Sequence, residues 1–215
     1  EIEQYTTIPY LGDIPQTNMS GQSSHGIVVR EDGRDAASEA FRILRSNISF
    51  MGIAEQDRAT PLQTILFTSS NPHAGKTFVA MNLAMTIAST DKRVLLIDLD
   101  LRRHVLSTQL GYSAKQHGIT SYLLGIGSID ELIHHTELHP KMDVIYAGIQ
   151  PPNPAEVLLS DRLDQLMVEL RKQYDYILID CTPSMSVADA VICDRLTDLT
   201  IYVVREGLLD RRQLP

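Results

Sequence analysis

The 215-residue sequence has only two cysteines, Cys181 and Cys193. Two cysteines are too few for a disulfide-stapled fold, and they are typical of small core residues in a reducing compartment. No run of 18 apolar residues occurs in the sequence, so no segment is predicted to cross a membrane as a helix.

Basic residues are also scarce, because 19 Lys and Arg stand against 27 Asp and Glu, for a net charge of −8. A nucleic-acid partner is therefore not expected, since phosphate neutralisation needs basic surface. The chain starts at Glu1 without an initiator Met or a signal peptide, and it contains no internal repeat or interdomain linker. We expect a soluble fragment of a longer protein that folds as a single domain over residues 1–215. Residues 1–34 should form an irregular arm, and the C-terminal end should be truncated.

A phosphate-binding loop is the strongest motif present. The segment SSNPHAGKT, residues 69–77, lies between the apolar run 62–67 and a helical pattern that starts at Phe78. Strand, tight loop and helix form the context that such a loop requires. Gly75 permits close approach to an oxyanion, Lys76 supplies charge, and the Thr77 hydroxyl can ligate Mg²⁺. Ser70 departs from the general pattern, which has Gly there. The cradle is assigned to His73, Ala74, Gly75, Lys76, Thr77 and Phe78.

Aspartates close two further apolar runs. The run 94–98 leads into Asp98 and Asp100, and the run 174–180 ends in Asp180. Each aspartate alone could be a helix cap or a solvated loop residue. However, the carboxyl ends of parallel strands meet at one edge of a sheet, and ligands bind there. Convergence beside the phosphate loop therefore favours nucleotide chemistry, with Mg²⁺ held by Thr77, Asp100 and Asp180.

Together these motifs resemble those of bacterial tyrosine kinases, the kinase domains attached to polysaccharide co-polymerases of capsule and exopolysaccharide export. The likeness extends to IPYLGDIP (8–15), to the Glu-x-x-Arg-x-x-Arg pattern of residues 39–45, and to PPNPAEVLLSDRL (151–163). It implies a P-loop NTPase-like α/β fold, with a mostly parallel twisted sheet and helices on both faces. It also implies an ATP- and Mg²⁺-dependent autokinase that phosphorylates tyrosines of a neighbouring subunit, on the cytoplasmic side of the bacterial inner membrane.

Two departures from the family bear on this reading. Asn71 stands where the related partition and septum-placing ATPases carry a Lys, which favours the kinase branch. The family's tyrosine-rich C-terminal tail is not within the given sequence, which ends in DRRQLP and has eight scattered tyrosines, so we expect either that the sequence ends early or that another acceptor is used. The alternative function is therefore a nucleotide-dependent ATPase switch that controls assembly of the export machinery.

The resemblance assigns roles to the catalytic residues. Lys76 bridges the β- and γ-phosphates, and Arg102 neutralises phosphate or meets the acceptor. Asp98 is the candidate for orienting the acceptor tyrosine, although the roles of Asp98 and Asp100 could be exchanged. Because an aspartate pKa near 4 is far below a tyrosine pKa near 10, orientation with late proton transfer is favoured over early deprotonation.

Glu39, Arg42 and Arg45 are the predicted subunit contacts. Their spacing alone favours a solvated helix flank with a local Glu39–Arg42 pair. The resemblance implies instead that they bind a neighbouring protomer in a ring. It also implies a membrane co-polymerase segment and a tyrosine phosphatase as partners. The apolar face of the same helix should be formed by Phe41, Leu44, Ile48 and Met51.

The apolar runs predict alternating strands and helices. His134, His135 and His139 are expected on a surface helix rather than at a zinc site, because Pro140 breaks the helical spacing and no Cys lies nearby. Strands are expected at 62–67, 93–98, 142–148, 175–180 and 199–204. Helices are expected at 35–51, 78–89, 160–174 with Ser160 as N-cap, and 185–196, with short ones near 121–125 and 129–135.

Overall fold

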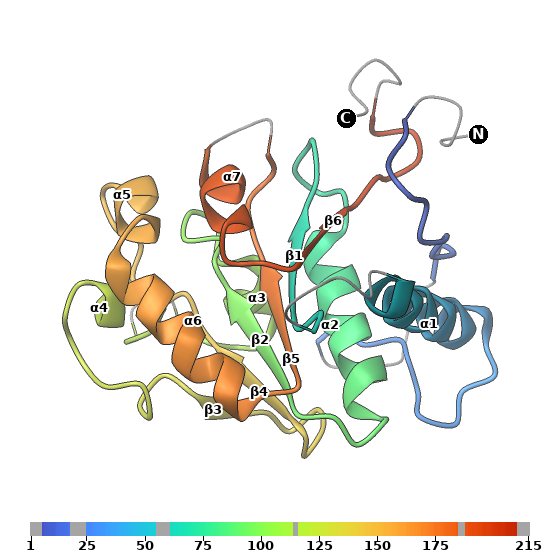
Figure 1. Ribbon diagram of the computed structural model, residues 1–215, viewed down its shortest axis with the longest axis horizontal. Coiled ribbons are helices and arrows are strands. Elements are labelled where there is room, and N and C mark those ends of the chain that lie inside the picture. Colours follow the sequence, from blue (N-terminus) through green and yellow to red (C-terminus); the bar gives the residue numbers. More distant parts are fainter. Residues whose placement is uncertain (1–5, 18–24, 55–60, 114–115, 185–187, 210–215) are drawn as a thin grey trace.

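The computed structural model describes residues 6–17, 25–54, 61–113, 116–184 and 188–209. Within these ranges a six-stranded sheet has the order β3-β4-β2-β5-β1-β6, and β3 alone runs antiparallel to its neighbour (Figure 1). The strands are β1 (Thr64–Thr68), β2 (Val94–Asp98), β3 (His134–His135), β4 (Met142–Ile145), β5 (Tyr176–Asp180) and β6 (Leu199–Tyr202).

The central strands are buried on both faces, which is why they read as continuous apolar runs. Their register places the functional ends level with one another. In the ladders, Asp98 of β2 stands beside Asp180 of β5, and Asp180 stands beside Phe67 of β1. One edge of the sheet therefore carries the start of the phosphate loop and two of the predicted aspartates.

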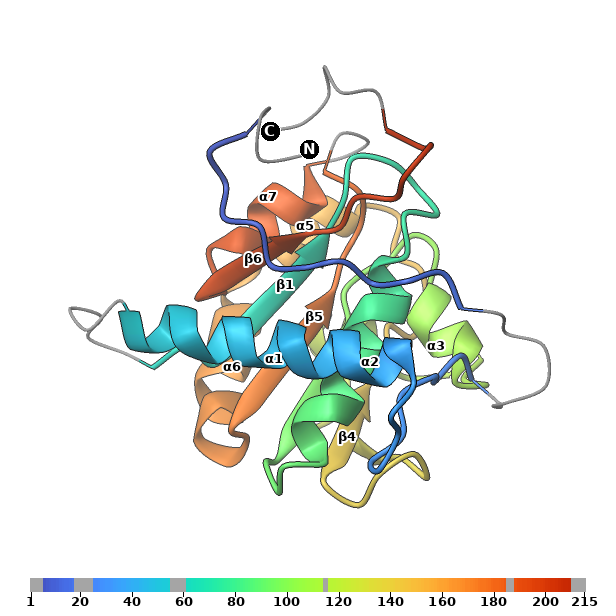
Figure 2. The ribbon, with the colours of Figure 1, turned by 90° about the vertical axis from the view of Figure 1, so that its right-hand side faces the viewer.

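Helices cover both faces of the sheet, as predicted. One face packs against α1 and α2, which lie in front of the sheet in Figure 2, and the other packs against α4, α6 and α7. No helix among the described residues is long and apolar enough to cross a bilayer. The helices are α1 (Ala36–Ala54), α2 (Lys76–Ala88), α3 (Val105–Gln109), α4 (Ile119–Leu123), α5 (Pro154–Leu158), α6 (Asp161–Gln173) and α7 (Asp189–Asp194).

Helix α1 follows its sequence pattern closely. Three of the four residues of the predicted apolar face, Phe41, Leu44 and Ile48, are buried against α2, whereas Met51 is only half-buried. Asp35 precedes the helix, and its Oδ1 accepts a 3.0 Å hydrogen bond from the Ser38 N–H group. This bond satisfies one of the free amides of the first turn, and it is the main reason that the pKa of Asp35 is lowered.

A buried asparagine joins the N-terminal arm to α2. The side chain of Asn82 is fully buried, and its Oδ1 accepts from the N–H groups of Val28 and Val29 at 2.8 and 3.3 Å. Its Nδ2 donates to the carbonyls of Gly26 and Phe78 at 3.1 and 2.9 Å. The described arm residues form no helix or strand, so Asn82 provides the backbone partners that a sheet would otherwise supply.

The predicted helix at 129–135 is wrong. Residues 130–132 form a turn, and His134 and His135 form β3 beside Val144 and Asp143. A seven-residue helix closes few hydrogen bonds, whereas the edge of β4 offers unpaired backbone groups. His139 lies before β4 and its carbonyl accepts from the N–H group of Met142, so the predicted surface helix for the three histidines is also wrong.

Other elements differ at their ends. Strand β4 stops at Ile145, three residues short of the expected end, and α5 forms within the Pro-rich segment where no helix was expected. Ser160 occupies the N-cap position of α6 as predicted, but its side chain makes no capping hydrogen bond. Helix α7 covers only part of the predicted 185–196, of which residues 185–187 lie outside the described ranges. Cys181 and Cys193 are buried core residues, as expected.

Candidate active site

The phosphate loop joins β1 to α2 at the carboxyl edge of the sheet. Its turn uses two left-handed residues, His73 with φ 64° and Gly75 with φ 100°. Glycine adopts such angles without strain, whereas a histidine does so at a cost. Helix α2 begins directly at Lys76, so its free N–H groups face the loop. The sequence-assigned cradle thus has the strand–loop–helix geometry that binds phosphate.

Asp180 lies beneath this loop. Its Oδ2 accepts a 2.6 Å hydrogen bond from the Thr77 hydroxyl, while its Oδ1 is buried without a partner among the described residues. Burial, with the nearby charge of Asp98, raises the pKa of Asp180 to about 8. Lys76 is also buried, which lowers its pKa, and the charges of Asp180 and Asp100 oppose that shift. Lys76, Thr77 and Asp180 are therefore brought together as the sequence predicted.

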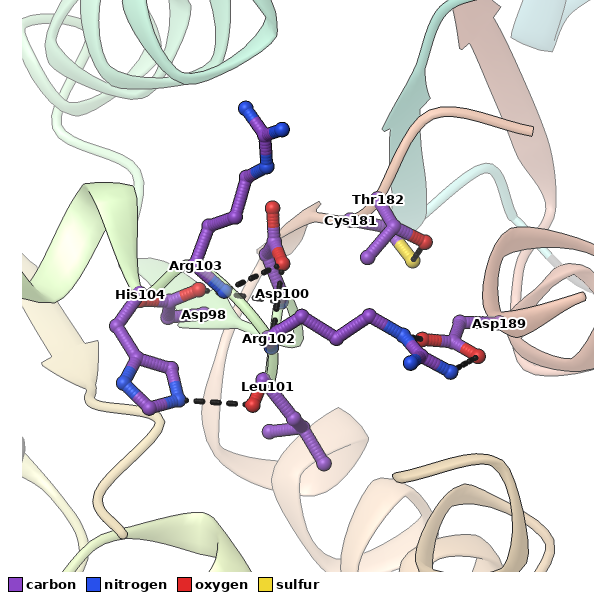
Figure 3. A network of polar contacts seen from close by, with 9 residues as sticks. All are labelled: Asp98, Asp100, Leu101, Arg102, Arg103, His104, Cys181, Thr182 and Asp189. Carbon is purple, nitrogen blue, oxygen red and sulfur yellow. Dashed lines mark hydrogen bonds and ion pairs between the residues drawn. The ribbon is translucent and has the colours of Figure 1, made fainter. Parts of the chain in front are cut away.

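Asp98 and Asp100 lie in different surroundings (Figure 3). Asp98 is fully buried, and its Oδ2 accepts from the N–H and Oγ–H groups of Ser107 at 3.0 and 2.6 Å. Its Oδ1 accepts from the Asp100 N–H group at 3.1 Å. Burial raises the pKa of Asp98 to about 6, and the Ser107 hydrogen bonds oppose the shift. Both oxygens of Asp98 are therefore occupied by its own chain.

Asp100 has one oxygen left for other partners. Its Oδ1 accepts from the N–H groups of Arg102 and Arg103 at 3.3 and 3.0 Å. Within the described part of the chain, no hydrogen bond reaches its Oδ2. The two aspartates differ because β2 ends at Asp98 and the chain then turns, so the two-residue alternation of a strand no longer applies.

Arg102 points toward α7 rather than toward the phosphate loop. Its guanidinium donates to both oxygens of the fully buried Asp189, at 2.7 and 3.1 Å. Arg103 extends in a different direction from Arg102 in Figure 3. Its positive charge adds to the effect of burial in lowering the pKa of Lys76. The sequence predicted Arg102 as the cation that faces the phosphates, whereas Arg102 is held by Asp189 and the arginine whose charge acts on Lys76 is Arg103.

The donors at this edge fit a magnesium ion. Asp180 offers a buried oxygen that no described residue bonds, Thr77 offers a hydroxyl, and Asp100 offers a second carboxylate oxygen. Magnesium typically takes one or two protein carboxylates and completes its shell with water and substrate phosphates. In the described residues no group of three or more His, Cys, Asp or Glu could hold a metal by itself. His135 instead pairs with Asp143 at 2.5 Å.

The predicted subunit contacts make bonds within their own chain. Arg42 pairs with Glu39 at 2.8 Å and donates to the Glu31 carbonyl at 3.1 Å. Arg45 donates to the carbonyl of Thr86, in the last turn of α2, at 3.0 Å. The local Glu39–Arg42 pair suggested by the spacing is therefore present, and Glu39 stays exposed.

Three buried polar residues at or near the site were not among the predicted site residues. Ser107 holds Asp98 and also accepts a 3.1 Å hydrogen bond from the Ala147 N–H group, which links α3 to the segment just after β4. Asp189 holds Arg102, and Asn82 holds the arm. Each acts on a partner at least nine residues away, so no local motif could have revealed the pairing.

The strand–loop–helix unit, with carboxylates gathered at the same edge of the sheet, defines a P-loop nucleotide-binding domain. In agreement, residues 62–199 match the AAA domain family. The chain is 36% identical over 174 residues to tyrosine-protein kinase Etk of Escherichia coli K12, and 32% identical over 197 residues to tyrosine-protein kinase YwqD of Bacillus subtilis. The kinase domain of E. coli Etk superposes with a TM-score of 0.85 at 31% identity, covering 99% of this chain and 84% of that domain.

The chain belongs to the family of bacterial tyrosine kinases. The Etk alignment covers 81% of this chain but 23% of Etk, and the YwqD alignment covers 91% of this chain and 80% of YwqD. The chain thus spans about a quarter of its longer relative and most of its shorter one.

Proposed function

We propose that this domain is an ATP-dependent protein-tyrosine kinase that transfers the γ-phosphoryl group to tyrosines of a neighbouring subunit. The observation that carries the proposal is the contact between Thr77 of the phosphate loop and Asp180, with Lys76 beside them and with one Asp180 oxygen that takes no partner from the described residues. Membership of the tyrosine kinase family supports the choice of acceptor.

Binding of the triphosphate rests on the loop backbone. The N–H groups of residues 73–78 hold the phosphates, and Lys76 draws the β- and γ-phosphates together. Thr77, Asp180 and Asp100 would hold Mg²⁺, which supplies neutralisation of the phosphate charge when bound. Arg103 is a better candidate than Arg102 for an additional cation at the phosphates, because Arg102 is engaged by Asp189.

For the acceptor hydroxyl, the hydrogen bonds favour Asp100 over Asp98. Asp98 has its oxygens filled by Asp100 and Ser107, so it acts as a positioning residue that fixes the loop after β2. Asp100 retains an oxygen that takes no hydrogen bond from the described residues, and the two acceptor sites on this oxygen would let it hold a Mg²⁺-bound water and orient the attacking tyrosine. We therefore favour Asp100 for orienting the acceptor and Asp98 for positioning, two roles that the sequence left exchangeable.

Asp98→Asn and Asp100→Asn are expected to fail in different ways. An asparagine at position 98 supplies only one accepting oxygen, so one donor of Ser107 or Asp100 loses its partner and stability falls by about 1–3 kcal/mol. Asp100→Asn should leave stability nearly unchanged but lower the rate of phosphotyrosine formation by about a hundredfold or more. Urea titration and initial rates at saturating ATP separate the two effects. A stable Asp98→Asn protein with the larger rate loss would reverse the assignment.

A ring-like assembly through α1 is part of the proposal. Glu39, Arg42 and Arg45 would contact the next protomer, with Ile43 and Phe50 exposed on the same helix. Glu39→Lys and the double Arg42→Ala, Arg45→Ala variant should lower the sedimentation coefficient of a form of the chain that self-associates. Because Arg45 also bonds within its chain, melting temperatures must be compared in parallel. Unchanged oligomer size in properly folded variants would exclude this surface.

The setting of the enzyme follows from the family resemblance. We propose that it regulates capsule or exopolysaccharide synthesis and export at the cytoplasmic side of the bacterial inner membrane. Its partners would then be a membrane co-polymerase segment, on the same or another chain, and a tyrosine phosphatase.

The product formed from ATP tests the central proposal. The chain is incubated with Mg·ATP and a tyrosine-containing polymer, and both phosphotyrosine and free phosphate are measured. Phosphotyrosine that forms in proportion to ADP supports the kinase. Phosphate release without phosphotyrosine, accompanied by nucleotide-dependent assembly, would replace it with the ATPase switch.

A further inference from the structure

The end of β6 and the segment after it contact the phosphate loop at three points. The backbone first continues the pairing of β6 with β1, because the Val203 N–H group donates to the Thr68 carbonyl at 2.8 Å. Side chains then bridge the two segments. The contacts are the hydroxyl pair of Tyr202 and Ser70, the 3.2 Å bond from Arg205 Nη1 to the His73 carbonyl, and the 3.4 Å bond from Asn71 Nδ2 to the Leu208 carbonyl.

The Arg205 contact falls on the strained point of the loop. His73 has a left-handed backbone, which a non-glycine residue adopts only when its surroundings hold it there. Its carbonyl belongs to the same peptide plane as the Ala74 N–H group, and in a trans peptide the two point in opposite directions. By binding the His73 carbonyl, Arg205 therefore holds this peptide plane so that the Ala74 N–H group points away from Arg205.

The other two contacts involve the positions at which the loop departs from related patterns. Ser70 stands where the general loop has Gly, and a glycine would offer no hydroxyl to Tyr202. Asn71 stands where the related partition ATPases carry a Lys, and here it reaches back to Leu208. The two residues that depart from the related patterns, Ser70 and Asn71, thus both bond to residues 202–208.

We propose that residues 202–208 form a brace that positions the phosphate loop and sets its affinity for nucleotide. The proposal rests on nucleotide binding by this loop, as set out above. The brace acts on nucleotide binding rather than on the phosphoryl-transfer step, because it lowers the free-energy cost of ordering the loop around the phosphates. Tyr202 and Arg205 are accordingly positioning residues, and their loss should weaken nucleotide binding more than it slows turnover.

The test uses residues 1–215 and a fluorescent mant-ADP probe in the presence of Mg²⁺. Arg205→Ala and Tyr202→Phe should each raise the dissociation constant about three- to tenfold, the effect of losing one hydrogen bond. The KM for ATP should rise by a similar factor while kcat changes less than about twofold. Arg205→Lys, which keeps a donor, should recover part of the affinity. Ser70→Ala combined with Tyr202→Phe should weaken binding no more than either alone, because one contact is removed in each case.

Arg93→Ala is the matched control. It removes an exposed arginine just before β2, at the opposite edge of the sheet, so it tests the general loss of positive charge. Equal weakening by Arg93→Ala and Arg205→Ala would overturn the brace, as would dissociation constants within twofold of the parent for both Arg205→Ala and Tyr202→Phe. If the parent chain binds no mant-ADP, the proposed function fails with it. If the parent binds and the variants match it, only the brace fails.

Discussion

Replacing Lys76 with Met is expected to lower phosphotyrosine formation by at least about a hundredfold. The ammonium group stands beside Asp180 and Asp100, and burial lowers its pKa, so it meets the substrate phosphates with little competing water. Methionine has a similar shape without the charge, and the backbone cradle would remain. The loss should therefore appear in catalysis more than in folding, as measured by anti-phosphotyrosine blotting and phosphosite mass spectrometry.

Lys92→Met supplies the comparison for this experiment. Lys92 is exposed after the end of α2, so its replacement removes the same charge away from the loop. It should retain nearly full activity. A Lys76→Met protein with activity close to that of Lys92→Met would show that the loop does not carry out the proposed transfer.

The largest effect on stability is expected from Asn82→Leu. Leucine fits a helix well but accepts no hydrogen bond, so the N–H groups of Val28 and Val29 lose their partner. Each buried amide left unpaired costs about 1–3 kcal/mol, and the free energy of unfolding should fall by about 3 kcal/mol. For a chain of this length the melting temperature would drop by roughly 10 °C. Urea titration gives the first value and calorimetry the second.

Asn47→Ala shows whether that effect is specific. The Asn47 side chain also holds the arm, but through a single bond from its Nδ2 to the Leu11 carbonyl at 2.9 Å. Its loss should cost about 1 kcal/mol, and hydrogen exchange should accelerate near residue 11 rather than at Val28 and Val29. Equal destabilisation by both variants would mean that Asn82 is not the main anchor of the arm.

Much of the fold could be predicted because its signals are local. Buried parallel strands read as apolar runs, and four of the five predicted strands end within two residues of the observed ends. The prediction of a helix at 129–135 was wrong because a short amphipathic pattern cannot show that a sheet edge lies nearby. Helix α5 was not predicted for a related reason, because five residues are too few to show a helical pattern in the sequence.

The residues of the candidate site likewise divide into those with a local sequence signal and those without one. The sequence by itself determined the loop, Lys76, Thr77 and the edge at which Asp98, Asp100 and Asp180 gather, because strand order and chain direction bring strand ends together. Only the tertiary structure decided three hydrogen-bonded pairs. Ser107 donates to Asp98, Arg102 donates to Asp189, and Arg205 donates to the His73 carbonyl. Those pairs join elements distant along the chain, and their geometry exists only once α3, α7 and the segment after β6 have packed onto the sheet.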